Sequence, residues 1–329
     1  MASAAGARMA EAAPLSGAAE RALVLGEPAF TTARALHGLA AAGIAVAAFW
    51  TGQDRSWTFD RYLERRNPAF SVGAFLKAQG LVSEGLRTRA DWDLVLACIE
   101  ARGITLLLNV HHTWRVPERV LQRLPGRTLN LHPALLPACR GPYPLPTLLA
   151  QELADRCGGV TLHLMTPAFD AGPIVAQQAV PLGPSRDVVA WELALARAYA
   201  ALTAGPLADY LAGRLQPVPQ DEGRATSARA PDLADGLSIS DGLPAAEALR
   251  RARLYGQTRP LTVEAAGRRW QAMLPARVLG LRSGQPPRLG LWRLSFDVAD
   301  ARLSLRRRWP GAGRRLWRRR WRRIARAQP

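Results

Sequence analysis

The stretch TLNLHPALLPACRG, residues 128–141, contains the most informative pattern of polar and apolar residues in the chain. It begins as a short apolar strand and ends in a turn marked by prolines. Asn130 and His132 lie two positions apart, so on a strand both side chains point to the same face of the sheet. Burying two polar side chains on one face is costly unless they form hydrogen bonds or take part in chemistry. This pair is therefore the first candidate for a functional site.

The segments before this stretch alternate between apolar strands and helices. We predict strands at 22–25, 44–50 and 104–110, and helices at 31–42 and 91–102. The strands are apolar without alternation, which is typical of parallel strands covered by helices on both faces. The turn after the first strand has one glycine rather than the G-x-G-x-x-G pattern, so a dinucleotide site is poorly supported.

The segments after this stretch follow a different pattern. A helix is predicted at 143–156, and strands at 160–165 and 174–180 are expected to form an antiparallel hairpin. Ser185 is the expected N-cap of a further helix that ends near Ala204. The whole pattern predicts an α/β fold with a Rossmann-like, mostly parallel sheet.

Composition divides the chain into segments. We expect a flexible leader at 1–20, a catalytic α/β domain at 21–215, a Pro- and Gly-rich linker at 216–228, a small β-rich domain at 229–304 and an Arg/Trp-rich tail at 305–329. The net charge is +18, and the 12 arginines after Asp300, with no acidic residue among them, leave 18 − 12 = +6 for the remainder. The excess of positive charge is therefore concentrated in the tail.

Cysteine content and hydropathy indicate a cytoplasmic protein. The three cysteines, Cys98, Cys139 and Cys157, are an odd number without the spacing of metal ligands, so we expect reduced thiols and no metal. No window approaches the roughly 20 apolar residues of a transmembrane segment, and none is predicted.

Asn130, His132 and Asp170, the last in the loop of the predicted hairpin, form a candidate catalytic set. An amide can donate to an oxyanion, an imidazole can transfer protons near neutral pH, and a carboxylate can orient the imidazole. The chain has no G-x-S-x-G motif, and Cys139 has no feature of a nucleophile. Direct attack by an amine on an acyl carbon fits this set better than a covalent enzyme intermediate.

His111, His112 and Trp114 follow the strand predicted at 104–110. Ligands of open α/β sheets bind beyond the carboxyl ends of the strands, so these residues are candidates for the wall of the site. A plain solvated loop and a metal site are the alternatives. Adjacent histidines on a strand point apart and seldom share a metal.

Longer motifs extend the N-x-H pattern. Asn130 to Pro137 (NLHPALLP), Arg140-Gly141, Gly159-Val160-Thr161 and Asp170-x-Gly172-Pro173-Ile174 occur in an order and spacing that resemble the 10-formyltetrahydrofolate-dependent formyltransferases. That family includes enzymes acting on methionyl-tRNA, on glycinamide ribonucleotide and on amino sugars. The resemblance is most specific over residues 128–178.

The resemblance implies roles for particular residues. Asn130, His132 and Asp170 match the catalytic set, in which the amide and a protonated His132 stabilise the oxyanion and Asp170 keeps His132 charged. The segment that would cradle the folate comprises Ala134, Leu135, Leu136 and Pro137. The cosubstrate implied is 10-formyltetrahydrofolate, and the acceptor is a primary amine.

The acceptor is less clearly indicated. Residues 224–281 resemble the OB-like C-terminal domain of the methionyl-tRNA and amino-sugar enzymes, and methionyl-tRNA is the expected acceptor. Pro142-Tyr143-Pro144 and the segment 54–86 depart from the tRNA enzymes. An amino sugar or secondary-metabolite amine is therefore the alternative acceptor, and a non-catalytic RNA-binding protein on this fold is the alternative class.

The Arg/Trp tail has three competing interpretations. Trp317, Trp321 and Ile324 would lie on one face of a helix surrounded by arginines between Arg306 and Arg326. Such a segment suits RNA, an anionic membrane surface or plain solvation.

Overall fold

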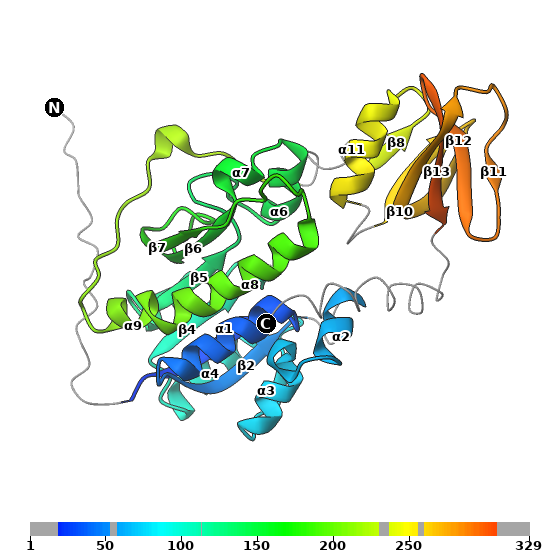
Figure 1. Cartoon of the computed structure of the whole chain (residues 1–329). Helices are drawn as coiled ribbons and strands as arrows, with labels where there is room; N and C mark the ends of the chain where they lie inside the picture. Colours follow the sequence, from blue (N-terminus) through cyan, green and yellow to red (C-terminus); the bar gives the residue numbers. More distant parts are fainter. Residues whose placement is uncertain (1–18, 53–57, 113, 230–236, 256–259, 308–329) are drawn as a thin grey trace. The chain divides into compact units, whose positions relative to one another are not determined.

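The computed structural model describes residues 19–52, 58–112, 114–229, 237–255 and 260–307. The chain divides into two compact units (Figure 1). The first contains the described residues of Met1–Leu148, Ala154–Pro181 and Glu192–Ala228, and the second those of Leu149–Leu153, Leu182–Trp191 and Arg229–Pro329.

The first unit is built on a seven-stranded sheet with the order β3-β2-β1-β4-β5-β6-β7. The strands are β1 (Arg21–Gly26), β2 (Ala45–Thr51), β3 (Ser83–Gly85), β4 (Leu106–Val110), β5 (Thr128–His132), β6 (Gly159–Leu164) and β7 (Ile174–Ala179). All neighbours from β3 to β5 are parallel, whereas β5–β6 and β6–β7 are antiparallel. The predicted mostly parallel sheet with an added hairpin is confirmed.

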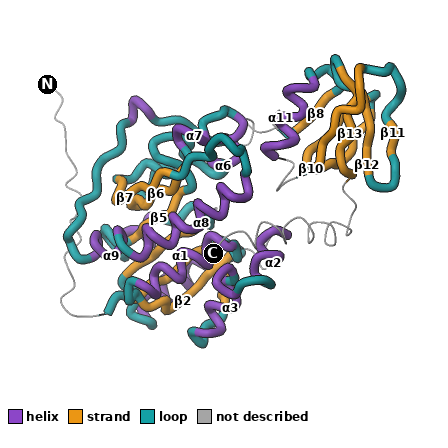
Figure 2. The backbone as a smooth tube through the Cα atoms, in the orientation of Figure 1, coloured by secondary structure: helices purple, strands orange, loops and turns teal. Residues whose placement is uncertain are grey.

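Helices lie between and after these strands, and Figure 2 draws them in purple and the strands in orange. They are α1 (Phe30–Ala41), α2 (Thr58–Glu64), α3 (Val72–Ala78), α4 (Asp91–Ala101), α5 (Glu118–Arg123), α6 (Pro144–Ala150), α7 (Ala154–Cys157), α8 (Val188–Ala204) and α9 (Pro206–Leu211). α1 and α8 approach closely at Gly38, where an added Cβ would lie 2.4 Å from the Ala200 carbonyl oxygen. This contact requires glycine, because any larger residue would push the two helices apart.

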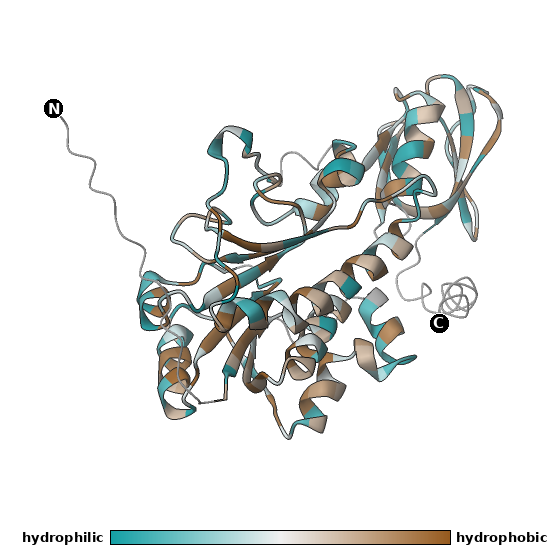
Figure 3. Cartoon of the chain, turned by 60° about the vertical axis from the view of Figure 1, so that its left-hand side comes forward, coloured by the Kyte–Doolittle hydropathy of each residue, from teal (hydrophilic) through white to brown (hydrophobic). Residues whose placement is uncertain are grey.

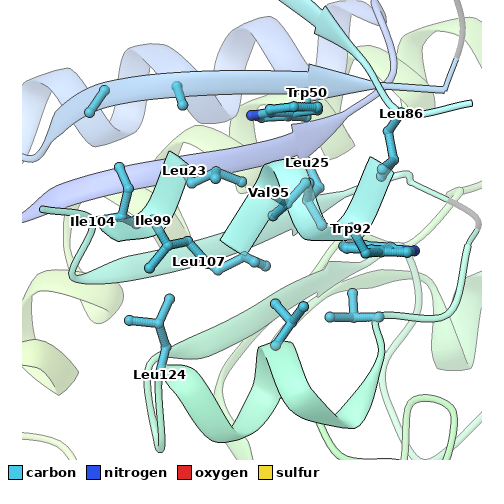
Figure 4. Packing of buried hydrophobic residues seen from close by; sticks show 14 residues of the cluster. Leu23, Leu25, Trp50, Leu86, Trp92, Val95, Ile99, Ile104, Leu107 and Leu124 are labelled. Atoms are coloured by element: carbon cyan, nitrogen blue, oxygen red, sulfur yellow. The ribbon is translucent and has the colours of Figure 1, made fainter. Parts of the chain in front are cut away.

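One face of the sheet packs against α4 and α5. Leu23, Leu25 and Leu107 of the strands meet Trp92 and Ile99 of α4 in one buried cluster (Figure 4). β4, β5 and β6 are buried along their entire lengths, and the strands of this sheet are mainly hydrophobic (Figure 3). Burial on both faces explains why the sequence shows continuous apolar runs there.

The strand order places the candidate functional residues at the carboxyl ends of the parallel strands. β1 lies between β2 and β4, so the connections on either side of it run in opposite directions, and ligands of such sheets bind where this reversal occurs. His111 follows β4, and His132 ends β5. Both candidate regions therefore lie at the carboxyl ends of neighbouring parallel strands.

The second unit has a six-stranded sheet with the order β11-β12-β13-β10-β9-β8. Its elements are β8 (Ser238–Ser240), α11 (Ala245–Tyr255), β9 (Leu261–Ala265), β10 (Arg268–Leu281), β11 (Arg288–Leu289), β12 (Arg293–Asp297) and β13 (Ala301–Arg307). β10 continues through Pro275 as one strand, and its register shifts between Met273 and Ala276. Proline fits this irregular position, because it cannot donate to a regular ladder.

Several expected boundaries differ from the structure. Residues 143–156 form two short helices, α6 and α7, rather than one. The N-cap of α8 is Asp187, whose Oδ1 accepts from Val189 N at 3.0 Å and Ala190 N at 3.1 Å, rather than Ser185. A nearby carboxylate satisfies the first free N–H groups of a helix better than a hydroxyl one turn earlier.

The structure does not test the expectations for the two terminal segments, a flexible leader and an Arg/Trp-rich tail. Most of the leader and residues 308–329 of the tail lie outside the described residues, and β13 continues to Arg307, beyond the boundary expected at 304. No helix among the described residues is long and apolar enough to span a membrane.

Candidate active site

Asn130 and His132 lie on β5, where the sheet changes from parallel to antiparallel pairing. Asn109 of β4 pairs with Asn130 on one side, and His163 of β6 pairs with Asn130 on the other. Asn130 is 7% exposed and His132 4% exposed. Both polar side chains are therefore buried on β5, an interior strand of the sheet. Their spacing predicts that they share one face of this strand.

Asp170 reaches this pair from the loop between β6 and β7. Its Oδ1 accepts from Asn130 Nδ2 at 3.1 Å, and its Oδ2 lies 3.6 Å from His132 Nδ1. Oδ2 also accepts from the backbone N–H of Gly141 at 2.8 Å. The three residues singled out from the sequence thus meet in one group.

The loop that carries Asp170 is tightly constrained. Asp170 has a φ of +51°, in the left-handed region that most residues avoid. Two positions later, a Cβ added to Gly172 would lie 1.9 Å from the Leu164 carbonyl oxygen. The sequence D-x-G therefore combines a strained carboxylate position with a glycine that allows the close approach.

Both nitrogens of His132 face acceptors. Nε2 lies 2.8 Å from the Cys139 carbonyl oxygen, which can only accept, so Nε2 carries a proton. Burial lowers the pKa of His132 by more than the nearby Asp170 raises it. The pKa of His132 therefore lies below the usual value for a histidine, and Asp170 is the neighbour that favours its charged form.

Asp170 remains ionised in this setting. Burial alone would raise its pKa, but His132, His163 and the Gly141 N–H together hold the pKa of Asp170 well below its usual range. A carboxylate with such a low pKa is a weak base. Its effect on the site is therefore mainly electrostatic and orienting.

His163 is a member of the group that sequence reasoning did not select. Its Nδ1 lies 2.8 Å from the Leu164 carbonyl oxygen, and its Nε2 lies 3.0 Å from Asn130 Nδ2 and 3.5 Å from Asp170 Oδ1. Asn130 Nδ2 thus has an acceptor for each of its N–H groups. The alternating pattern of β6 contained the signal, but using it required the register between β5 and β6.

Residues 134–137 have no spare backbone N–H for a ligand. Their backbone groups bond within the chain to His132 O, Cys157 O, Ala138 N, Thr161 Oγ1, Gln177 Nε2 and Thr226 N. Leu136 and Val160 are also buried, whereas Leu135 is partly exposed. A cradle here is limited to carbonyl lone pairs and the partly exposed side chains of Leu135 and Pro137.

Two loops beside the group offer a more accessible surface. Arg115 Nη2 donates to the Pro167 carbonyl oxygen at 2.5 Å, and its guanidinium lies 5.9 Å from the centre of the Phe169 ring. Phe169 is 60% exposed, and Trp114 is partly exposed. Phe169 directly precedes Asp170 in the loop between β6 and β7.

His111 and His112 are not a solvated loop. His111 has a φ of +65°, its Nε2 lies 2.9 Å from Thr31 Oγ1, and its ring stacks on Tyr199. His112 is 6% exposed and packs near Trp92 and Trp114. Burial lowers the pKa of each imidazole to about 4.

The structure gives no support to thiol or metal chemistry in its described part. Burial raises the pKa of the Cys139 thiol to about 11, which disfavours the nucleophilic thiolate. Within the described residues, no cluster of three or more His, Cys, Asp or Glu side chains has the arrangement of a metal site.

Comparisons with known proteins identify the family. The family model described as formyl transferase matches residues 99–200. A methionyl-tRNA formyltransferase of Chloroflexus aurantiacus is 34% identical over 237 residues, which cover 71% of this chain and 73% of the relative. One of Nitratidesulfovibrio vulgaris is 30% identical over 70% of this chain and 66% of the relative. The chain belongs to the folate-dependent formyltransferase family, which confirms the resemblance, and it is a transferase enzyme.

Solved structures share the fold at low sequence identity. HypX of Aquifex aeolicus in complex with tetrahydrofolic acid is 16% identical, with a TM-score of 0.60 over 88% of this chain and 44% of that protein. A sugar N-formyltransferase of Shewanella is 17% identical, with a TM-score of 0.58 over 79% of this chain and 99% of that protein.

Proposed function

We propose that the chain transfers the formyl group of 10-formyltetrahydrofolate to a primary amine, and that the acceptor is methionyl-tRNA. The observation that carries the reaction is the group of Asn130, His132 and Asp170, in which the Asp170 carboxylate lies 3.1 Å from the amide nitrogen of Asn130 and 3.6 Å from Nδ1 of His132. These are the groups that amine attack on a formyl carbon requires. The reaction would take place in the cytoplasm.

Asn130 is the proposed oxyanion donor. Attack by the amine places negative charge on the formyl oxygen, and an N–H held in a buried site stabilises that charge. Both N–H groups of Asn130 have acceptors in the free protein, His163 Nε2 and Asp170 Oδ1. The oxyanion would replace one of these two acceptors as it forms.

His132 is the proposed proton carrier. The attacking nitrogen loses one proton, and the folate nitrogen gains one when its bond to the formyl carbon breaks, so the protons balance. The neutral ring can take up the first proton at Nδ1, where Asp170 Oδ2 at 3.6 Å would stabilise the resulting imidazolium. The same proton can then pass to the departing nitrogen.

The donor is proposed to bind between residues 134–137 and the Trp114–Phe169 surface. A pterin ring is flat, and the exposed Phe169 ring and the partly exposed Leu135 offer apolar contact next to Asp170. Residues Ala134 to Pro137 would shape the pocket rather than supply N–H donors, since their N–H groups are already bonded.

Two observations support methionyl-tRNA. Relatives that carry this name are 30–34% identical to the chain. The second unit also exposes Arg277, Arg282 and Arg288, and Leu279 and Trp292 are exposed on the same unit. Arginines that meet phosphates and an aromatic ring that can stack on a base are typical of nucleic-acid contacts.

One observation favours the alternative acceptor, an amino sugar. Tyr143 is 38% exposed and lies two residues after Gly141, whose N–H bonds to Asp170. A partly exposed aromatic ring on this loop can pack against a sugar or a nucleobase.

An acceptor screen tests the proposal. Full-length protein and a form ending at Arg307 would be incubated with 10-formyltetrahydrofolate and either methionyl-tRNA or a nucleotide-linked amino sugar. We expect formyl-methionyl-tRNA, and no product from His132→Ala. Loss of tRNA formylation alone in the shortened form would assign the tail to RNA binding, and unchanged activity would exclude that role.

Other results would replace the proposal. Formylation of the amino sugar alone would transfer the assignment to the alternative acceptor. Tight RNA binding without transfer to any amine would favour a binding protein.

A further inference from the structure

The segment 216–228, expected from its composition to be a linker, packs against the candidate site. Ser227 forms a parallel bridge with Arg140, with N–H···O distances of 2.9 Å from Arg140 N to Thr226 O and 2.7 Å from Ala228 N to Arg140 O. Cys139 N also donates to Thr226 Oγ1 at 2.9 Å. This segment therefore belongs to the first unit and lines the loop that follows β5.

Gln220 of this segment joins the two loops that complete the site. Its Nε2 donates to the Asp170 carbonyl oxygen at 2.8 Å and to the Gly172 carbonyl oxygen at 2.7 Å. Its Oε1 accepts from Arg140 Nε at 3.1 Å and from Arg140 Nη2 at 2.8 Å. A single amide thus links the loop between β6 and β7 to the loop after β5.

Both loops place polar groups around His132. The first presents the Asp170 carboxylate, 3.6 Å from His132 Nδ1. The second presents the Cys139 carbonyl oxygen to His132 Nε2 and the Gly141 N–H to Asp170 Oδ2. Movement of either loop would therefore change the electrostatic surroundings of the imidazole.

The Asp170 loop needs an external anchor. A φ of +51° at an aspartate is a strained conformation that persists only where surrounding contacts impose it. The two bonds from Gln220 fix the carbonyl groups of Asp170 and Gly172, one on each side of Ala171. Glu222 also bonds Arg140, but its side chain is 70% exposed, so that ion pair contributes little.

We propose that Gln220 is a positioning residue for formyl transfer: it sets the distance between Asp170 and His132 and thereby the basicity of the imidazole. This inference rests on the proposed function of the group that it positions. Gln220 itself touches neither substrate nor reacting atoms.

The test compares Gln220→Met with Gln220→Glu in the full-length enzyme. The Met variant keeps the length of the side chain and loses all of its hydrogen bonds. The Glu variant can still accept from Arg140 but cannot donate to the two carbonyl oxygens. We expect both to lower kcat by about 10- to 100-fold, as the loss of two partly buried hydrogen bonds implies, with little change in KM.

The pH profile separates positioning from a merely structural role. Asp170 raises the pKa of His132, so a displaced Asp170 would lower that pKa further, and the acid limb of kcat would move to lower pH. Gln178→Met, the same change at an exposed glutamine, and Glu222→Gln should leave both kcat and the limb unchanged. A fall in kcat with an unmoved limb, or no fall at all, would overturn the proposal.

A substrate-free readout keeps the inference distinct from the proposed function. Titration of the His132 imidazole by NMR, with its signal identified by its absence in His132→Ala, reports the pKa whatever the acceptor is. We expect the pKa to be lower in Gln220→Met than in wild type. Equal values would exclude the inference even if formyl transfer is established, whereas a shift without transfer would exclude only the proposed function.

Discussion

Two N-x-H tripeptides lie side by side in the parallel sheet, Asn109-Val110-His111 at the end of β4 and Asn130-Leu131-His132 at the end of β5. Their asparagines are paired in register. On β5 the asparagine and histidine meet Asp170. On β4, Asn109 bonds the backbone of His112, and His111 turns toward Thr31 and Tyr199.

The difference shows what makes such a tripeptide chemically useful. Burial lowers the pKa of both His111 and His132, but a carboxylate opposes this effect only at His132. His132 can therefore gain a proton during a reaction, whereas His111 is held neutral. The deciding feature is a loop from β6–β7 that is distant in sequence from both tripeptides.

The largest expected contrast is in catalysis. His132→Ala or Asp170→Ala should lower kcat/KM by about a thousandfold, because each removes part of the proton path. His111→Ala should change it by less than about tenfold. Rates of formyl transfer, with whichever acceptor the screen identifies, measure the contrast, and thermal unfolding checks that each variant is folded.

Asp93→Ala is the matched control for the aspartate, since Asp93 is exposed on α4 in an ion pair with Arg119. Near wild-type turnover in His132→Ala, or an equal loss in His111→Ala, would show that the two tripeptides do not differ as argued.

The paired asparagines give the next contrast. Asn130→Ala should cost about 2–4 kcal/mol of transition-state stabilisation, as expected for an oxyanion donor. Asn109→Ala removes bonds to the backbone of His112, so it should lower the free energy of unfolding and leave kcat nearly unchanged. Both effects follow from kinetics and denaturant unfolding of the two variants, and the reverse pattern would exclude Asn130 as the donor.

The pH dependence of the unfolding free energy tests whether burial keeps the histidine that follows His111 uncharged. The pKa of His112 is about 4 rather than 6.5, so below pH 6.5 the unfolded chain binds more protons, and stability falls as the pH decreases toward 4. In His112→Gln, the loss of unfolding free energy between pH 7.5 and pH 5 should be smaller by about 2 kcal/mol.

Urea unfolding at the two pH values measures this change. His37→Gln serves as control, because His37 is less buried and its change should be smaller. An identical pH dependence in wild type and His112→Gln would show that His112 is not held neutral by burial.

The smallest expected effect concerns the bond that positions His111. Thr31→Val keeps the shape of the side chain and removes the hydroxyl that lies 2.9 Å from His111 Nε2. Stability should fall by about 1 kcal/mol while kcat stays the same. A tenfold loss of kcat measured alongside a normal melting temperature would place His111 in the reaction.

Local pattern sufficed for much of the fold. The short apolar strand expected at the start of residues 128–141 is present and spans Thr128–His132. Asp170 was selected from the D-x-G motif, and it does lie beside Asn130 and His132. The sequence pattern was sufficient for features that depend on one short segment, such as this strand and this loop.

The remainder depended on pairings between distant segments. His163 enters the group only through the register of β5 with β6. Residues 216–228 have the composition of a linker, and only the contacts of Gln220 and Thr226 with the loops around Arg140 and Asp170 show their place in the first unit. Composition reports local flexibility and cannot report such contacts.

The position of Gln220 has a practical consequence for dissecting this enzyme. A catalytic fragment designed from composition would end near 215, before Gln220, and would lack the side chain that joins the Arg140 and Asp170 loops. A fragment extended to Ala228 would retain that side chain and the Ala228 N–H bond to Arg140. Thirteen residues that resemble a spacer would thus separate a fragment with a complete site from one with a loosened site.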